Sequence, residues 1–470
     1  MGRDWDSQPG YNPILMTDSY KLTHYKMYPP GTEHVGSYFE NRAGGEYPYT
    51  VFFGLQYLLM RYLEDVVVTQ SDLDDAIEVS NQHFGQELLN VEGWKHIINE
   101  HGGRLPVSIR AVPEGTVVDE SNVLMTIENT DPKCYWLTNH LETLLVQLWY
   151  PCTVATISRE QKRVLRAGLE ATAENADGLP FMLHDFGYRG SSSIESAAIG
   201  DAAHLINFMG TDTIAGIELL RKYYDADMPA FSVPAAEHST ITSWESSDGE
   251  IGAFRNILKQ YPQGIVSVVS DSYDIYQACR NFWGEELYED VVNGFNENGR
   301  RIVVRPDSGD PATVLVDCLK ILEDKFGSDQ NAKGYKVLPP CIRVIYGDGI
   351  DRRSLPDIVA AIADADFSLE NVVFGSGGGL LQDCNRDTQR MAMKCSWIQR
   401  DGKVEDVSKR PVSDLGKYSK SGKLKLVLGE DKRYSTVGIG EFGKNRLVEV
   451  FRDGQILKRT TLEEIRKRAA

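Results

Sequence analysis

Short apolar runs recur through the middle of the chain, and each is followed by a polar or glycine-rich segment and then by a stretch with helical periodicity. Their spacing, roughly twenty to forty residues, is typical of βα units in a parallel sheet. Eight units are the number found in a (β/α)8 barrel, so the pattern predicts an α/β fold with a barrel-like domain. An open, doubly wound sheet is the alternative. The eight runs are Phe181–Leu183, Leu205–Phe208, Phe231–Val233, Ile265–Val269, Ile302–Val304, Ile342–Ile345, Val372–Phe374 and Met391–Trp397.

The pattern on either side of this region is different. Residues 70–100 and 135–173 have helical periodicity, the second range containing Pro151, whereas residues 104–129 alternate like three antiparallel strands. The chain after residue 400 is polar and rich in basic residues, with two short predicted strands and a closing helix. We therefore predict three parts: an N-terminal mixed α+β region (1–180), a barrel-like catalytic domain (181–398), and a C-terminal segment (399–470) that completes the flanking domain.

Composition narrows the possible functions. The chain has 470 residues and a net charge of −18, which argues against a nucleic-acid-binding protein that relies on bulk electrostatics. No apolar run approaches the roughly eighteen residues of a membrane span, and the N-terminus has no apolar leader. The seven cysteines are scattered and include no Cys-x-x-Cys pair, so we expect reduced thiols, a cytoplasmic location and no zinc site.

Residues with useful chemistry lie just after the apolar runs. Consecutive glycines in Gly375–Leu381 (GSGGGLL) would let backbone N–H groups approach a phosphate, although a flexible turn is the alternative. Asp271, Asp307 and Asp348 follow three other runs, and Arg305 adds a cation. One such aspartate alone would suit a helix N-cap, but several at one sheet edge favour a hydroxyl-bearing ligand such as ribose, with Mg²⁺ carried by phosphates.

Two further loops carry candidate functional side chains. His238 lies in FSVPAAEHSTITSW, where an imidazole can act as a base, a proton shuttle or a phosphoryl acceptor, or can simply bond the loop. Phe186 and Tyr188 place aromatic surface beside Arg189, for a flat ligand or for packing. Taken together, the residues predict a barrel enzyme that acts on a sugar phosphate with a planar group, and they leave the reaction open.

Several motifs, in order along the chain, resemble those of the nicotinamide phosphoribosyltransferase family over about residues 12–470: DSYKLTHY, VFFGLQY, WYPCTVAT, LHDFGYRG, SVPAAEHSTIT, VSDSYDIY, RPDSG and FGSGGGLLQ. The resemblance implies a type II phosphoribosyltransferase fold and a head-to-tail homodimer with active sites at the subunit interface. It also implies a reaction of nicotinamide with phosphoribosyl pyrophosphate, giving nicotinamide mononucleotide and pyrophosphate. Mg²⁺ is the implied cofactor, and ATP is an implied co-substrate coupled through a phosphohistidine.

The resemblance assigns roles to individual positions. The implied catalytic residues are His238, which would carry the phosphoryl group, Asp271 and Asp307. The implied nicotinamide-binding residues are Phe186, Asp212, Arg305 and the partner subunit's Tyr20. The implied phosphate and ribose contacts are Arg189, Arg386, Gly347, Asp348, Gly377, Gly378, Lys409 from the partner, Arg42, Lys417 and Lys423.

Nicotinate phosphoribosyltransferase is the nearest alternative, and Asp212 discriminates between the two activities. A carboxylate accepts a hydrogen bond from the amide of nicotinamide but repels the carboxylate of nicotinate. A phosphohydrolase or sugar-phosphate isomerase, and a nucleotide-sensing protein, are more distant alternatives. The short loop after Arg42, Phe181 in place of an expected tyrosine, and Lys423 in place of an expected arginine depart from the animal enzymes and favour a bacterial or phage origin.

Overall fold

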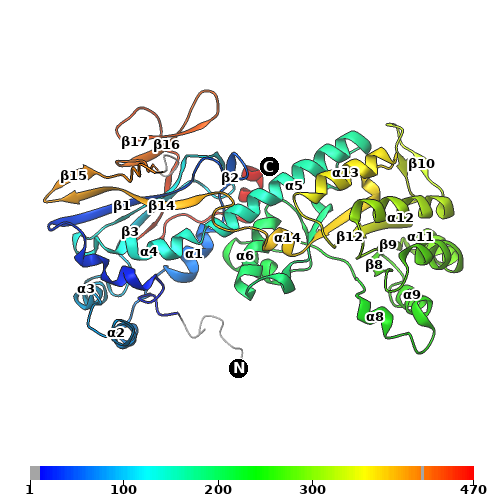
Figure 1. Cartoon of the computed structure of the whole chain (residues 1–470), viewed down its shortest axis with the longest axis horizontal. Helices are drawn as coiled ribbons and strands as arrows, with labels where there is room; N and C mark the ends of the chain where they lie inside the picture. The colour runs from blue at the N-terminus through cyan, green and yellow to red at the C-terminus, as the bar shows by residue number, and fades with distance from the viewer. Residues whose placement is uncertain (1–10, 414–417) are drawn as a thin grey trace. The chain divides into compact units, whose positions relative to one another are not determined.

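The computed structural model describes residues 11–413 and 418–470, which form two compact units (Figure 1). The flanking unit comprises residues up to Thr156, Tyr223–Asp225 and Cys384–Ala470. The barrel unit comprises Ile157–Lys222 and Ala226–Asp383. Both divisions lie earlier in the chain than the expected boundaries after residues 180 and 398. No helix in the described ranges has both the length and the apolar composition needed to cross a bilayer.

The barrel unit is built on six parallel strands in the order β7-β6-β13-β12-β9-β8. Apart from Ile265, which is exposed at the start of β8, most of their apolar side chains are buried, as expected of a sheet covered by helices. The strands are β6 (Leu183–Asp185), β7 (Gly210–Thr211), β8 (Ile265–Val269), β9 (Arg301–Arg305), β12 (Ile342–Tyr346) and β13 (Val372–Ser376).

A single irregular segment, residues 231–236, links the two edges of this sheet, and we call it the closing segment. At one end Phe231 forms a parallel bridge with Gly210 of β7, and its N–H donates to the Met209 carbonyl at 2.8 Å. At the other end Ser267 of β8 donates to the Pro234 carbonyl and accepts from the Ala236 N–H, both at 2.9 Å. The backbone hydrogen bonds therefore run from one edge strand to the other through the closing segment.

The predicted count of eight strands is wrong. In the run Leu205–Phe208, Leu205 is the last residue of helix α6 (Ile194–Leu205) and the strand begins only at Gly210, while Phe231–Val233 supplies an isolated bridge. Met391–Trp397 lies in β14 (Met391–Arg400), which belongs to the antiparallel sheet of the flanking unit. The periodicity of a short apolar run does not distinguish a strand from the buried end of a helix. Nor does the run indicate which sheet a strand will join.

Helices follow the strands and cover the sheet of the barrel unit; α9, α11 and α12 lie around β8 and β9 in Figure 1. α12 shows the local rules clearly, since Pro311 occupies its first turn and the Asp310 side chain accepts from the Thr313 N–H at 3.0 Å. The helices of this unit not yet placed are η4 (Leu179–Phe181), η5 (Tyr188–Gly190), α7 (Ile214–Tyr223), α8 (His238–Thr242), α9 (Gly249–Gln260), α10 (Ile275–Gln277), η6 (Ala278–Glu286), α11 (Tyr288–Asn298), α12 (Pro311–Phe326), α13 (Ser354–Asp364), η7 (Leu369–Asn371) and α14 (Gly378–Leu381).

The flanking unit contains a seven-stranded antiparallel sheet in the order β15-β14-β1-β5-β3-β18-β19. β18 pairs with β3, so a strand from the end of the chain lies within a sheet that begins near its start. Its strands are β1 (Thr32–Asn41), β3 (Val107–Ala111), β5 (Val123–Asn129), β14, β15 (Lys403–Asp406), β18 (Val448–Arg452) and β19 (Gln455–Ile456). Two small pairings add β2 (Tyr49–Val51) to β4 (Val117–Asp119), and β16 (Leu424–Leu428) to β17 (Tyr434–Gly438).

The helices of the flanking unit refine the sequence predictions. The predicted helix over 70–100 is two helices, α2 (Gln70–Phe84) and α3 (Val91–His101), because Gly85 ends α2 in the left-handed region at φ 67°. The predicted helix over 135–173 is likewise interrupted near Pro151, as the proline suggests: α4 (Leu137–Val146) ends before it, and Pro151 lies in the first turn of α5 (Trp149–Thr172), where its missing N–H costs no hydrogen bond. The others are η2 (Ser19–Lys26), α1 (Leu55–Tyr62), η3 (Pro132–Cys134) and α15 (Leu462–Ala469).

Candidate active site

A cavity of about 710 Å³ opens at the carboxyl ends of the barrel-unit strands, and we call it the strand-end cavity. Loops after β6, β7, β9, β12 and β13 contribute to it, together with the residues that follow the closing segment. This is the edge at which parallel α/β sheets bind their ligands. Its walls are formed by Phe186, Tyr188, Arg189, Asp212, Thr213, Glu237, His238, Ser239, Arg305, Asp307, Gly347, Asp348 and Gly377.

His238 begins α8 and forms a pair with Asp271, the second residue after β8. The His238 Nε2 lies 3.0 Å from Asp271 Oδ1, and the carboxylate is nearly buried while the imidazole is 46% exposed. Asp271 Oδ2 also accepts from the Asp307 N–H at 3.0 Å and from the Ser308 hydroxyl at 2.6 Å. A neutral imidazole that donates Nε2–H to this fixed carboxylate carries its lone pair on Nδ1.

Arg305, at the end of β9, connects the carboxylates to the aromatic wall. Its Nη2 donates to Asp307 Oδ2 at 2.8 Å, and its guanidinium carbon lies 5.8 Å from the centre of the Phe186 ring. Arg305 Nη1 also lies 3.5 Å from the Ala236 carbonyl of the closing segment. A cation held in this way can contact both an aromatic ligand and developing negative charge.

Two glycines position the Phe186 ring. A Cβ on Gly375 would lie 1.9 Å from Phe186 Cε2, and one on Gly347 would lie 3.0 Å from the same ring. The ring therefore packs directly on the backbone at the ends of β13 and β12. This close approach is a second role for the glycine-rich segment, besides the predicted phosphate contact at Gly377 and Gly378.

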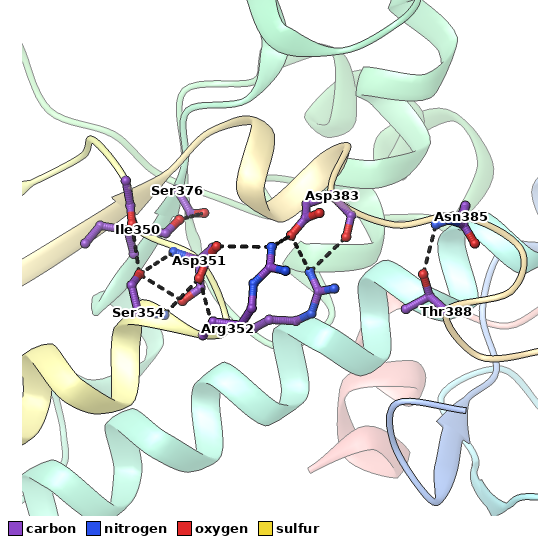
Figure 2. A network of polar contacts seen from close by, with 10 residues as sticks. Ile350, Asp351, Arg352, Ser354, Ser376, Asp383, Asn385 and Thr388 are labelled. Carbon is purple, nitrogen blue, oxygen red and sulfur yellow. Dashed lines mark hydrogen bonds and ion pairs between the residues drawn. The ribbon is translucent and has the colours of Figure 1, made fainter. Parts of the chain in front are cut away.

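The loop after β13 is tied to the loop after β12 by a polar network (Figure 2). The Ser376 hydroxyl donates to the Ile350 carbonyl at 2.5 Å, and Arg352 Nη1 donates to the Asp383 carboxylate at 3.0 Å. Asp351 in turn accepts from the Ser354 N–H at 2.9 Å. Because both ends of the glycine segment are anchored, its backbone N–H groups are preorganised for an anion.

Beneath the cavity lies a buried pair of carboxyl groups that sequence reasoning missed. Asp185 ends β6, Asp201 lies on α6, and both are completely buried. Asp201 accepts from the Thr211 hydroxyl at 2.7 Å, and Asp185 accepts from the Gly187 N–H at 2.7 Å. Burial raises the pKa of both groups, and the proximity of the two carboxyls raises that of Asp201 further. A single acid on a helix gives no sequence signal that distinguishes such a position from a solvent-exposed one.

Asp212 follows β7 at the wall of the cavity. Its N–H donates to the Asp185 carbonyl at 2.9 Å, and its Oδ1 accepts from the Ser232 hydroxyl of the closing segment. Glu237 and Ser239, which flank His238, also line the cavity and bond to each other. Sequence reasoning missed both as site residues, although their position after a predicted strand was the available signal.

The predicted site residues fall into two groups. Those in the barrel unit converge: all except Asp271 and Gly378 line the strand-end cavity, Asp271 bonds His238, and Gly378 adjoins Gly377. In the flanking unit a pocket of about 350 Å³ is lined by Tyr20, Arg42 and Arg386, with Lys21 and Lys394 among their neighbours.

Two predicted lysines of the flanking unit, Lys409 and Lys423, line neither cavity. Lys423 Nζ lies 3.8 Å from the centre of the Trp397 ring, and the Lys409 N–H donates to the Ser419 hydroxyl at 2.7 Å. Lys417 lies outside the described residues. The implied contribution of Tyr20 and Lys409 across a subunit interface stays a prediction.

The barrel-like sheet and the strand-end cavity define an α/β enzyme for sugar-phosphate ligands, with cations, carboxylates, a glycine loop and an aromatic wall around one space. Residues 181–455 match the sequence profile of the nicotinate phosphoribosyltransferase family, and residues 12–109 match that of the nicotinamide phosphoribosyltransferase N-terminal domain. The chain belongs to the nicotinate phosphoribosyltransferase family.

Curated relatives cover almost the whole chain. It is 48% identical over 468 residues to a nicotinamide phosphoribosyltransferase of Xanthomonas campestris pv. campestris, covering 97% of this chain and 98% of that protein. It is 33% identical over 498 residues to a nicotinamide phosphoribosyltransferase of Acinetobacter baylyi, with 98% and 97% covered.

Solved structures establish the fold. The nicotinate-nucleotide pyrophosphorylase of Pyrococcus furiosus is similar with a TM-score of 0.61 at 15% identity, covering 100% of this chain and 97% of that one. Human nicotinic acid phosphoribosyltransferase is similar with a TM-score of 0.59 at 17% identity, covering 97% of this chain and 93% of that one. The predicted type II phosphoribosyltransferase fold is confirmed.

We expect Gly375→Ala to displace the Phe186 ring, because the new methyl group would occupy the position of the ring edge. Misplacing a positioning group by about 1 Å costs on the order of 100-fold in rate, so kcat/KM for phosphoribosyl transfer should fall by about that factor. Gly178→Ala is the matched control, since a Cβ there meets no atom within 4 Å. Equal kinetics for the two variants would contradict the steric role.

The buried acid pair predicts an unusual pH dependence of stability. Because the folded-state pKa values are raised, the pair costs free energy of folding increasingly as pH rises above the ordinary carboxyl value of about 4. Asp201→Asn should therefore raise the free energy of unfolding more at pH 8 than at pH 4. Urea denaturation at both pH values measures this, with the exposed Asp227→Asn as control; a pH-independent effect would contradict it.

Proposed function

We propose that this protein transfers the phosphoribosyl group of phosphoribosyl pyrophosphate to nicotinamide, giving nicotinamide mononucleotide and pyrophosphate in NAD salvage. The observation that carries the proposal is the strand-end cavity, where Phe186, Asp212 and the Gly377 loop line one space. Full-length relatives named nicotinamide phosphoribosyltransferase support the same choice. We propose further that it acts in the cytoplasm as a homodimer with the partner subunit's Tyr20 and Lys409 completing each site.

The chemistry requires orientation and charge stabilisation. Displacement of pyrophosphate at the anomeric carbon passes through an oxocarbenium-like state, and nicotinamide is a weak neutral nucleophile. Packing its ring against Phe186 orients the ring nitrogen, while Arg189 and the glycine loop after β13 hold phosphate oxygens. Arg305, paired with Asp307, can contact the pyridine side of the cavity.

Mg²⁺ fits this donor set. Asp307 and Asp348 line the cavity with carboxylate oxygens, the ligands that Mg²⁺ prefers beside substrate phosphates. When bound, the ion would neutralise charge on the pyrophosphate. The contribution of the chain itself is to hold the two substrates in line within the cavity.

His238 is the proposed site of coupling to ATP. Asp271 accepts Nε2–H, so Nδ1 can attack the terminal phosphorus of ATP; a P–N bond forms, the P–O bond to ADP breaks, and ADP leaves with the bonding pair. Water later cleaves the P–N bond and releases phosphate. The phosphoryl group would place negative charge beside the sugar site, which can stabilise an oxocarbenium-like state.

Asp212 is the proposed determinant of specificity. One of its oxygens accepts from Ser232, which fixes the carboxylate at the cavity wall. It can accept a hydrogen bond from the NH₂ group of nicotinamide, whereas the carboxylate of nicotinate would meet a like charge. Like-charge contacts in a closed interface cost several kcal/mol, enough for strong discrimination.

We expect pyrophosphate release with nicotinamide to exceed that with nicotinate, and Asp212→Asn to lower the ratio of the two kcat/KM values by about tenfold or more, because the repelling charge is lost. Asp227→Asn, an exposed acid outside the cavity, is the matched control. A wild-type preference for nicotinate, or an unchanged ratio in Asp212→Asn, would count against the proposal.

His238→Ala should abolish ATP stimulation and leave slow ATP-independent synthesis, because the acceptor nitrogen is lost while the cavity remains. Labelled γ-phosphate from ATP should enter wild-type protein as an acid-labile, base-stable adduct and be absent from the variant. The exposed His83→Ala is the control. Stimulation that survives in His238→Ala would refute the coupling role.

A further inference from the structure

The flanking unit holds a cluster of four metal-binding side chains that the phosphoribosyl chemistry does not use. His96 and His101 come from α3, Asp131 precedes η3, and Cys134 ends η3. One ligand atom from each lies within 4.8 Å of all the others. None of the four lines the strand-end cavity or the flanking-unit pocket described above.

The two imidazoles converge on one carboxylate oxygen. His96 Nε2 and His101 Nε2 each lie 2.7 Å from Asp131 Oδ2. The rings are steeply inclined, with an interplanar angle of 77° and centroids 5.5 Å apart, so their Nε2 atoms approach the oxygen from different directions. The side chains are thus arranged as ligands around a common centre would be, but without an ion both imidazoles bond directly to the Asp131 oxygen.

The donor set suits zinc. Two imidazole nitrogens, a thiolate and a carboxylate are the ligand types of tetrahedral Zn²⁺ sites, and the mixture of nitrogen and sulfur disfavours Mg²⁺ and Ca²⁺. Bonds of about 2.0 Å to nitrogen and oxygen require ligand separations of about 3.3 Å, so the imidazoles need to withdraw from Asp131 by about 0.6 Å. That movement is within the reach of side chains that are partly exposed.

We propose that His96, His101, Asp131 and Cys134 form a structural zinc site that fastens the end of α3 to η3. It would join two segments that are some thirty residues apart in sequence. η3 leads directly into α4, so the site would also fix the start of that helix.

Hydrogen bonds from neighbouring residues orient Asp131 for binding a cation. The Lys133 N–H donates to Asp131 Oδ1 at 2.8 Å, which orients Oδ2 toward the histidines, as outer-shell partners orient metal ligands. Asn129 Nδ2 holds the Asp131 carbonyl at 2.8 Å. Although burial opposes it, hydrogen bonds from His96 and His101 lower the pKa of Asp131 to about 2, so the carboxyl is ionised near neutral pH.

Zinc binding would release the proton of the Cys134 thiol. Burial raises the pKa of the Cys134 thiol to about 12, so the thiol is protonated without metal. When the Zn–S bond forms, the S–H bond breaks and its proton passes to solvent. Each imidazole would donate its Nε2 lone pair to the ion and carry its proton on Nδ1.

Sequence reasoning expected no zinc site because no Cys-x-x-Cys pair is present. Here the ligands are spaced His-x₄-His and Asp-x₂-Cys, and only one is a cysteine. The tertiary packing of α3 against η3 brings the two half-motifs together.

The test uses the whole protein, first freed of metal by a chelator and then titrated with Zn²⁺ or Co²⁺. We expect one equivalent of either ion per chain, with Co²⁺ giving a near-ultraviolet thiolate charge-transfer band and the intense visible bands of tetrahedral coordination. Cys134→Ser should remove the charge-transfer band, and His101→Gln should weaken Zn²⁺ binding by roughly 100-fold or more, since loss of even an outer-shell partner costs about 10- to 100-fold. The exposed His83→Gln is the matched control.

A second measurement distinguishes a loss of zinc binding from a general folding defect of the variant. Zn²⁺ should raise the unfolding temperature of the wild-type protein and of His83→Gln, and should leave that of the His101→Gln variant unchanged. A wild-type protein that binds neither ion stoichiometrically, or a cobalt spectrum without the thiolate band, would overturn the proposal and leave a hydrogen-bonded His–Asp–His cluster. Zn²⁺ affinity that is equal in His101→Gln and His83→Gln would overturn it as well.

Discussion

The barrel unit depends on the backbone hydrogen bonds that its closing segment makes with the two edge strands. Phe231 bonds to the β7 side and Pro234–Ala236 bond to Ser267 of β8, so a stretch too irregular to be a strand satisfies both edges. Unpaired edges are costly and prone to aggregation, so these hydrogen bonds protect both edges although the segment contains a proline. The same constraint sets the position of His238, because α8 begins two residues after the segment ends.

The cavity at the strand ends depends on several groups whose burial or close packing costs folding free energy. Asp271 is nearly buried and accepts a hydrogen bond from the Asp307 N–H, after the next strand. Asp185 and Asp201 are buried together and have raised pKa values. The Phe186 ring packs against glycine backbone. Each arrangement costs folding free energy through desolvation, charge proximity or backbone entropy. The apolar layer between strands and helices offsets these costs, with Val268, Val304 and Phe374 fully buried.

In the flanking unit, by contrast, strands from distant parts of the chain form one sheet. β1 pairs with β14 and β3 pairs with β18, so neither end of the chain can build this sheet alone. Side chains that the family resemblance assigns to phosphate binding, such as Arg42 and Arg386, meet in a pocket only because of that pairing. The cluster of His96, His101, Asp131 and Cys134 arises in the same way, from α3 lying against η3.

The sequence by itself determined the α/β class, the strand-end location of the chemistry and most of the residues that converge in the cavity. These features are local: a strand, its following loop and the next helix are contiguous, and glycine, aspartate and histidine in such loops signal their function. Only the tertiary structure decided the number of strands, the linking role of residues 231–236, the sheet that Met391–Trp397 joins, the buried Asp185–Asp201 pair and the four-ligand cluster. All of these depend on pairing between segments far apart in the chain, which a short apolar run or a single acid on a helix does not encode.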